Sequence, residues 1–356
     1  MKIIFFGVIL RIFIAIINVY YITLPGAEYD ALAFHEAAQS VSKSWDNINL
    51  EIGWIYATAL GVIYKYTSDS LFLGCMVSVL AWFISAIVLK KSLNDLNLID
   101  SNIQIIIFFY TFIPSSVLFT SITLREPFQL LFYNLSILSL INIFYKKKKK
   151  YFLLLFLVLL ALSMLHKVFI FFSIFVFLVL GLCKLITKFK ILYFIIFLLI
   201  TYFFYEDFFI LLFKFIPIDQ LSIYQIIQGH INNMTISRAS YINDIIIINN
   251  FTDLILYSIR SLTNYFLQPF PINHENIYDS FLFIENIIRL FFVVLIIINL
   301  FKFTHKNFVY FVLLVIFYFF TEFIWALGTN NWGAAVRHHL PTLGILLLLS
   351  FYSVKK

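Results

Sequence analysis

The sequence predicts an all-α polytopic integral membrane protein with about ten transmembrane helices, forming a single transmembrane domain over residues 1–356. The chain is 62% hydrophobic and only 12% charged, whereas a typical soluble domain is about 25% charged. Its apolar runs have the length of membrane-crossing helices, which satisfy their own backbone hydrogen bonds inside the bilayer. The composition therefore excludes soluble enzymes, disulfide-stapled secreted domains and disordered scaffolds.

Apolar runs separated by Gly, Pro and charged residues give the predicted spans. They cover residues 3–23, 71–89, 103–120, 127–145, 151–166, 168–183, 191–205, 282–301, 307–325 and 341–353. The first run resembles a signal peptide, but it contains Arg11 and lacks a small-x-small cleavage site, so we expect an uncleaved span. The stretch Gly53–Tyr66 is 14 residues long and rich in Trp and Tyr, which indicates a helix lying in the membrane interface.

The distribution of lysines predicts the orientation. With the N-terminus inside and residues 53–66 in the interface, the cytoplasmic turns collect 15 of the 25 Lys and Arg residues, including the run Lys146–Lys150. The net charge of +7 is thus explained by membrane anchoring and does not indicate a nucleic-acid partner. We expect both termini in the cytoplasm. Because the inner loops are short, the functional face should lie outside, with one large loop at 206–280.

Asp30 is the first candidate catalytic residue. It follows the first span within PGAEYDALAFHEAAQ, where a carboxylate at the membrane surface suits a general base for a lipid-borne substrate. The alternative is that Asp30 only caps a helix beginning at Ala31, although one residue can do both. His35 and Glu36 follow in the same segment and are candidates for the acceptor side of the site.

Two charged corners follow further outer helix ends. The pair Arg125–Glu126 comes after the third predicted span, and the pair His166–Lys167 separates the fifth span from the sixth. Arg125, His166 and Lys167 are candidates for binding an anionic phosphate, and Glu126 is a candidate catalytic carboxylate. The alternative is that both pairs only anchor helix ends at the lipid headgroups.

The turn GTNNWGAAVRHHLP places three basic side chains directly before the last span. Arg337 offers a planar fork for phosphate oxygens, His338 can take part in proton transfer, and His339 can donate to a pyrophosphate. Adjacent histidines rarely share one zinc ion, and no carboxylate follows at i+4, so no metal site is predicted. Arg260, in the large outer loop, is a further phosphate-binding candidate.

The sequence contains no P-loop, GxGxxG, HExxH, kinase or nucleophile-elbow pattern. We therefore expect chemistry that needs neither a nucleotide nor a redox cofactor, with a divalent cation left open. Ionisable residues deep in the predicted spans are scarce, and Arg11 is the clear case. This scarcity argues against a proton-coupled transporter.

The order of these features resembles the GT-C class of membrane glycosyltransferases. In that class an acidic residue follows the first span, an interfacial helix comes next, and a second acidic residue follows the third span. Asp30, residues 53–66 and Glu126 match these positions, FIPSSVLFTSITLRE is similar to the class's P…S…E pattern, and RHHLP looks like its lipid-phosphate-binding element. The resemblance implies a GT-C-like fold.

The size, the Ile, Phe, Lys and Asn bias and the single large outer loop look like the Wzy-type O-antigen or capsule polymerases. This resemblance implies a bacterial inner-membrane enzyme that polymerises undecaprenyl-pyrophosphate-linked oligosaccharide units. Its partners would be the bilayer, the polyprenyl-linked oligosaccharide and, from the same pathway, a chain-length regulator and a flippase. The alternative is a GT-C transferase that moves a single sugar from undecaprenyl phosphate. A lipid-oligosaccharide flippase is the least favoured hypothesis.

Overall fold

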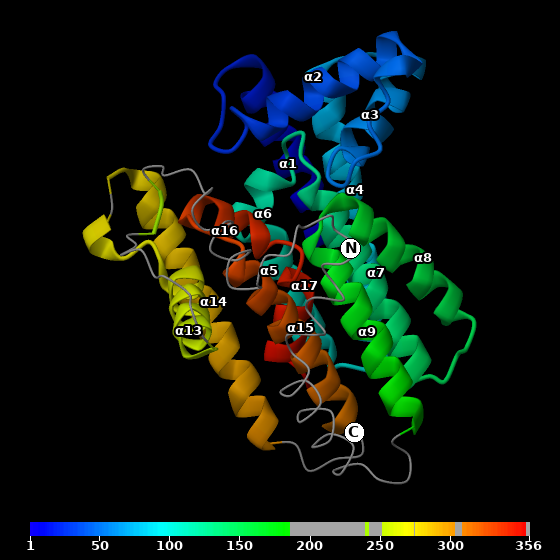
Figure 1. Cartoon of the computed structure of the whole chain (residues 1–356), viewed down its shortest axis with the longest axis vertical. Coiled ribbons are helices and arrows are strands. Elements are labelled where there is room, and N and C mark those ends of the chain that lie inside the picture. The colour runs from blue at the N-terminus through cyan, green and yellow to red at the C-terminus, as the bar shows by residue number, and fades with distance from the viewer. Residues whose placement is uncertain (186–238, 242–250, 274, 303–307, 354–356) are drawn as a thin grey trace.

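The computed structural model describes residues 1–185, 239–241, 251–273, 275–302 and 308–353, and all regular elements in these ranges are helices (Figure 1). In chain order they are α1 Lys2–Tyr20, α2 Asp30–Lys43, η1 Trp45–Asn47, α3 Ile55–Tyr66, α4 Leu71–Asp95, α5 Asp100–Phe112, α6 Pro114–Phe119, α7 Glu126–Phe144, α8 Tyr151–Leu165, α9 Val168–Leu185, α13 Phe251–Leu267, η2 Pro271–Asn273, α14 Ile277–Lys302, α15 Phe308–Leu327, α16 Trp332–His338 and α17 Leu343–Ser350.

The prediction of a multi-pass helical membrane protein is confirmed in its general form. In the described ranges, five helices are long and apolar enough to cross a bilayer: α1, α4, α7, α14 and α15. The apolar helices α8 and α9 also match predicted runs, but the apolar part of each is shorter than the other five. The finer prediction of about ten spans is not confirmed.

Two predicted spans have a different structure, and a third lies outside the described residues. The run 103–120 is divided into α5 and α6, because Ile113 is extended before Pro114 and the proline starts a new helix. The run 341–353 contains only the eight-residue helix α17, whose residues are all buried. It packs against α5, α7, α14 and α15, so this apolar run fills the centre of the bundle. The run 191–205 is not described.

A helix, α3, is present where the sequence predicted an interfacial one, and it pairs with α2 at one end of the bundle (Figure 1). Apolar side chains repeat at helical spacing on α2, with Phe34, Ala38 and Val41 buried. Gly61 of α3 faces them: a Cβ there would lie 2.6 Å from the Val41 Cβ and 2.7 Å from the Ala38 carbonyl oxygen. The missing side chain therefore lets the two short helices approach closely.

Arg11 is fully buried within α1 and holds this helix to the segment around α6. Its Nε donates to Thr120 Oγ1 at 2.6 Å, and its guanidinium carbon lies 3.4 Å from the centre of the Trp82 ring. A further nitrogen donates to the Thr111 carbonyl at 3.0 Å. These neutral acceptors and the indole ring offset part of the cost of burying the charge.

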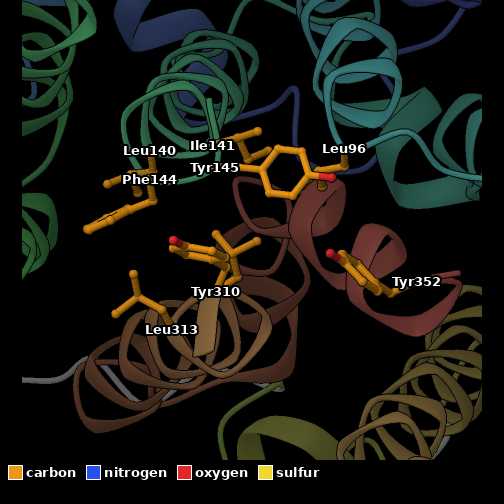
Figure 2. A pocket seen from close by; sticks show the side chains of 9 residues that line it. Leu96, Leu140, Ile141, Phe144, Tyr145, Tyr310, Leu313 and Tyr352 are labelled. Carbon is orange, nitrogen blue, oxygen red and sulfur yellow. The ribbon is translucent and has the colours of Figure 1, made fainter. Parts of the chain in front are cut away.

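The other end of the bundle carries the lysine-rich turns. Lys146 pairs with Asp95 at 2.6 Å, and Lys147 donates to the Tyr310 hydroxyl at 3.0 Å. An apolar pocket at this end lies between α7, α15 and the C-terminal segment, and Figure 2 shows the rings of Tyr145, Tyr310 and Tyr352 around it. The 19 residues of α7 separate this end from Glu126 by about 28 Å, at roughly 1.5 Å per residue.

Candidate functional site

Arg337 joins two of the predicted site carboxylates. It lies in the last turn of α16, which begins where the Asn331 side chain accepts a hydrogen bond from the Ala334 N–H at 2.7 Å. One terminal nitrogen of Arg337 donates to Asp30 Oδ2 at 2.6 Å, and the other donates to Glu126 Oε1 at 2.6 Å. The structure thus brings together three predicted residues from distant parts of the sequence.

The two ion pairs differ in exposure. The side chain of Glu126 is 3% exposed, that of Arg337 is 16% exposed and that of Asp30 is 55% exposed. Burial lowers the pKa of Arg337, but the nearby carboxylates outweigh this effect and raise its pKa above the ordinary value. Arg337 therefore stays protonated and keeps a firm bond to Glu126, while its bond to Asp30 faces water and can exchange for another anion.

Local sequence explains where Arg125 and Glu126 lie. Glu126 begins α7 with Pro127 beside it, so its carboxylate sits at the positive end of that helix. Arg125 precedes it, donates to the Leu165 carbonyl at 3.4 Å and lies 5.6 Å from the centre of the Phe34 ring. Burial lowers the pKa of Arg125, although the Glu126 carboxylate opposes that shift.

Two buried polar atoms in this cluster lack a hydrogen-bond partner. They are Glu126 Oε2 and Arg125 Nε. Most buried polar groups in proteins are paired, so these two atoms, one donor and one acceptor, mark unused hydrogen-bonding capacity. Both atoms belong to the cluster around Arg337, which is where a polar ligand would use them.

His166 and His338 lie next to the cluster but are not its cationic members. The His338 ring stacks on Trp325 with centres 3.9 Å apart, and its Nδ1 lies 2.7 Å from Thr329 Oγ1. Burial and the nearby arginines lower the pKa of His166 to about 3 and that of His338 well below its usual range. These shifts favour the neutral imidazole in both rings, and the phosphate contact of His166 stays a prediction. Lys167 is exposed at the same corner.

His339 faces the interior instead of the predicted phosphate site. It is 1% exposed, its Nδ1 lies 2.6 Å from Glu322 Oε2, and its Nε2 lies 3.2 Å from the Tyr265 carbonyl oxygen. Thr342 donates to the other oxygen of Glu322. His339 therefore belongs to a separate buried cluster that connects α13, α15 and the end of α16.

The remaining predicted residues lie outside the Arg337 contacts. His35 Nδ1 lies 2.9 Å from the Tyr64 hydroxyl, so His35 joins α2 to α3, and burial lowers its pKa. Glu36 is exposed on the next position of α2. Arg260 lies on α13 and is not among the residues that bond to Arg337 in the described ranges.

Sequence reasoning missed the residues that hold α16 in place. The Trp332 Nε1 donates to Asp279 Oδ1 at 3.2 Å, and Asp279 is fully buried. The backbone of residues 239–241, from the large loop, bonds to both sides of Asn331. The sequence offered two signals, Trp332 in a polar turn and Asp279 at the start of a long apolar helix. No sequence spacing indicates that these two residues contact each other.

A second buried ion pair lies near the middle of α14. Arg289 bonds to Glu285 at 2.7 Å, and both side chains are 3% exposed. The Ser115 backbone N–H donates to Glu285 Oε2 at 3.0 Å, and its hydroxyl donates to the other oxygen. The i,i+4 spacing of the two charges was a readable signal for this pair.

The described site consists of one guanidinium, that of Arg337, held between the carboxylates of Asp30 and Glu126. In the residues that the structure describes, no three His, Cys, Asp or Glu side chains come together as a metal-ligand group. Comparisons with protein-family models, curated proteins and solved structures found no match for this chain. The geometry of the site itself therefore carries the functional argument.

Proposed function

We propose that the chain is a membrane glycosyltransferase that polymerises undecaprenyl-pyrophosphate-linked oligosaccharide units of a bacterial surface polysaccharide on the extracytoplasmic face. The observation that carries this proposal is the position of Arg337 between Asp30 and Glu126, at one end of a bundle of membrane-length apolar helices. A polyprenyl donor keeps its lipid in the bilayer and its pyrophosphate at the surface. A cationic site at the ends of membrane-length helices lies where that pyrophosphate would be, at the membrane surface.

Arg337 supplies the phosphate contact in this proposal. Its bond to the exposed Asp30 exchanges for pyrophosphate oxygens, while buried Glu126 continues to orient the guanidinium. Arg125 lies beside Glu126, and Lys167 is exposed at the neighbouring corner. These cations stabilise the negative charge that develops on the leaving pyrophosphate.

Asp30 supplies the base. Once released from Arg337, its half-exposed carboxylate accepts the proton of an acceptor hydroxyl. The acceptor oxygen forms a bond to the anomeric carbon of the donor glycan, the bond from that carbon to the pyrophosphate oxygen breaks, and undecaprenyl pyrophosphate leaves with the electron pair. The reaction balances without a nucleotide or an electron carrier.

The same geometry also serves the alternative transferase. Only one guanidinium is bound between the two carboxylates in the described site, and one guanidinium fork matches a single phosphate. A single-sugar transfer from undecaprenyl phosphate would use the same roles for Arg337 and Asp30. The products separate these two functions.

Deletion of the gene in the native host, followed by gel analysis of surface glycolipid, tests the proposal. A ladder that collapses to one repeat on the lipid core supports polymerisation, and loss of one sugar or decoration supports single-sugar transfer. Accumulation of lipid-linked units inside the cell, with no repeat at the surface, would point to a flippase. Complementation should succeed with Lys149→Gln, at the opposite end of the bundle, and fail with Arg337→Gln.

A further inference from the structure

A pocket of about 290 Å³ opens between the second half of α2 and the start of α3, away from the ion pairs of Arg337. Ligand pockets in proteins begin at about 300 Å³, so this one can hold a small group. Trp54, Asn47, Asn49, Ser40 and Thr58 line it over a floor of small apolar side chains. None of the lining residues is charged.

The polar atoms of the pocket are partly used within the protein and partly free. Asn47 Nδ2 donates to the Ser40 carbonyl at 2.9 Å, and Asn49 Oδ1 accepts from the Glu51 N–H at 2.8 Å. The Asn47 Oδ1 acceptor and the Asn49 Nδ2 donor have no hydrogen bond in the described residues. The pocket therefore offers one amide acceptor and one amide donor in fixed side chains.

Trp54 adds an aromatic surface. Its side chain is 38% exposed, and its ring packs edge-on against Phe34 at 5.6 Å between centres. An indole with an apolar face and neutral amides beside it matches a sugar ring, which presents C–H groups on one face and hydroxyls that both donate and accept. A phosphate or a metal ion would instead need charged partners, which the lining lacks.

The pocket is physically connected to the Arg337 cluster. Phe34 contacts both Trp54 and the Arg125 guanidinium. Gly53 precedes Trp54 with φ +95°, and a Cβ there would lie 2.6 Å from an Arg125 nitrogen. Ten residues of α2 separate Asp30 from Ser40, which is about 15 Å at roughly 1.5 Å per residue. A sugar in the pocket therefore cannot contact Asp30. An extended oligosaccharide, however, can place one of its sugars in the pocket and another at Asp30.

We propose that this pocket binds a neutral sugar residue of the acceptor oligosaccharide, beyond the sugar whose hydroxyl reacts at Asp30. The acceptor role rests on the proposed transferase function, whereas the binding of a sugar rests on the pocket alone. Holding a remote sugar lowers the entropic cost of placing the reacting hydroxyl. It also selects longer acceptors over single sugars.

The first test measures binding to the full-length protein in lipid nanodiscs. The probe is the repeat-unit oligosaccharide released by mild acid from the host's own surface glycolipid. We expect saturable binding that weakens roughly tenfold or more in Trp54→Ala and in Asn49→Ala, because aromatic anchors dominate small interfaces. Trp45→Ala is the matched control, since Trp45 is 43% exposed but does not line the pocket. Unchanged affinity in both pocket variants would overturn the proposal.

The second test separates the pocket from the transferase proposal and from lipid binding. Arg337→Gln should abolish transfer but keep oligosaccharide binding, whereas Trp54→Ala should raise KM for the acceptor and leave kcat nearly unchanged. Trp54-dependent binding in a chain without transferase activity would refute the proposed function and keep the sugar site. Brominated phosphatidylcholine that quenches the Trp54 fluorescence equally with and without saturating oligosaccharide would assign the pocket to a lipid and refute the sugar site.

Discussion

Asp30 illustrates how one exposed side chain can matter to chemistry and little to stability. Its bond to Arg337 is 2.6 Å long, but the Asp30 side chain is 55% exposed. We expect Asp30→Asn to change the free energy of unfolding by no more than about 1 kcal/mol, the usual range for exposed ion pairs. Its transferase turnover should fall about 100-fold or more, because a general base is lost. Turnover and thermal melting of the purified protein measure both effects, and full activity would exclude Asp30 as the base.

Glu126 pairs with the same arginine, but we expect its substitution to lower the stability of the protein more than that of Asp30 does. Its side chain is 3% exposed and accepts two hydrogen bonds from Arg337. Glu126→Gln removes the buried negative charge, so we expect a loss of stability of about 3 kcal/mol or more. The melting temperature in detergent should therefore fall further than in Asp30→Asn. Equal melting temperatures for the two variants would contradict the buried ion pair.

His166 gives the cluster a predictable response to acid. Its pKa is lowered to about 3 by burial and by Arg125, Arg337 and Lys167. In the unfolded chain the pKa of His166 is about 6.5. Between about pH 3 and pH 6.5, His166 is therefore protonated in the unfolded chain but not in the folded protein. Stability is full above about pH 6.5 and falls as the pH drops toward 3. Melting from pH 7.5 to 4.5 should show a smaller loss in His166→Gln than in wild type. A wild-type melting temperature that rises as the pH falls would contradict the burial of His166.

At the scale of elements, the hairpin of α2 and α3 depends on a close helix contact. A Cβ at Gly61 would approach the Ala38 carbonyl oxygen to 2.7 Å, and backbone atoms cannot move aside cheaply. We expect Gly61→Ala to cost about 1–3 kcal/mol through overpacking, and to increase proteolysis of the segment between the two helices. Gly181→Ala is the matched control, because a Cβ there meets nothing within 4 Å. Equal protease resistance in the two variants would show that the hairpin tolerates separation.

Local sequence predicted elements well where a residue changes the backbone directly. The predicted span 127–145 coincides with α7, whose first turn contains Pro127, and the aromatic stretch after Gly53 correctly indicated a short helix. Pro114 was passed over inside an apolar run, although it divides α5 from α6. The run after Pro341 is apolar enough to predict a span, but apolar composition cannot distinguish a buried helix such as α17 from one that faces lipid.

The sequence singled out Asp30, Glu126 and Arg337, which the structure brings together, but it did not predict the ion pairs that join them. Asp30 and Glu126 were candidates as carboxylates at outer helix ends, and Arg337 was a candidate because its planar fork suits phosphate oxygens. Their mutual ion pairs depend on how α16 packs, and α16 is positioned by Asp279 and residues 239–241. The neutrality of His166 and His338 depends on burial beside Trp325. No sequence pattern predicts these packing contacts.

At the scale of the whole molecule, the two ends of the bundle differ in charge chemistry. Lys146 and Lys147 lie at one end of α7, and Glu126 with its partner Arg337 lies at the other. From the positive-inside rule we expect the lysine end to lie in the cytoplasm. The proposed site then faces outward, where a lipid-linked glycan already carried across the membrane would meet it. This orientation is a physical requirement of the proposed reaction.

Labelling of engineered thiols in intact cells decides the orientation. Glu36 on α2 and Lys149 between α7 and α8 are both exposed, and Figure 1 shows α2 and the turn from α7 to α8 at opposite ends of the bundle. We expect a membrane-impermeant maleimide to label Glu36→Cys in intact cells and Lys149→Cys only after the membrane is permeabilised. The unmodified chain gives the background from Cys75, which is buried, and from Cys183. The reverse pattern would place Arg337 in the cytoplasm and refute an extracytoplasmic transferase, since its base and its phosphate site would then face the wrong compartment.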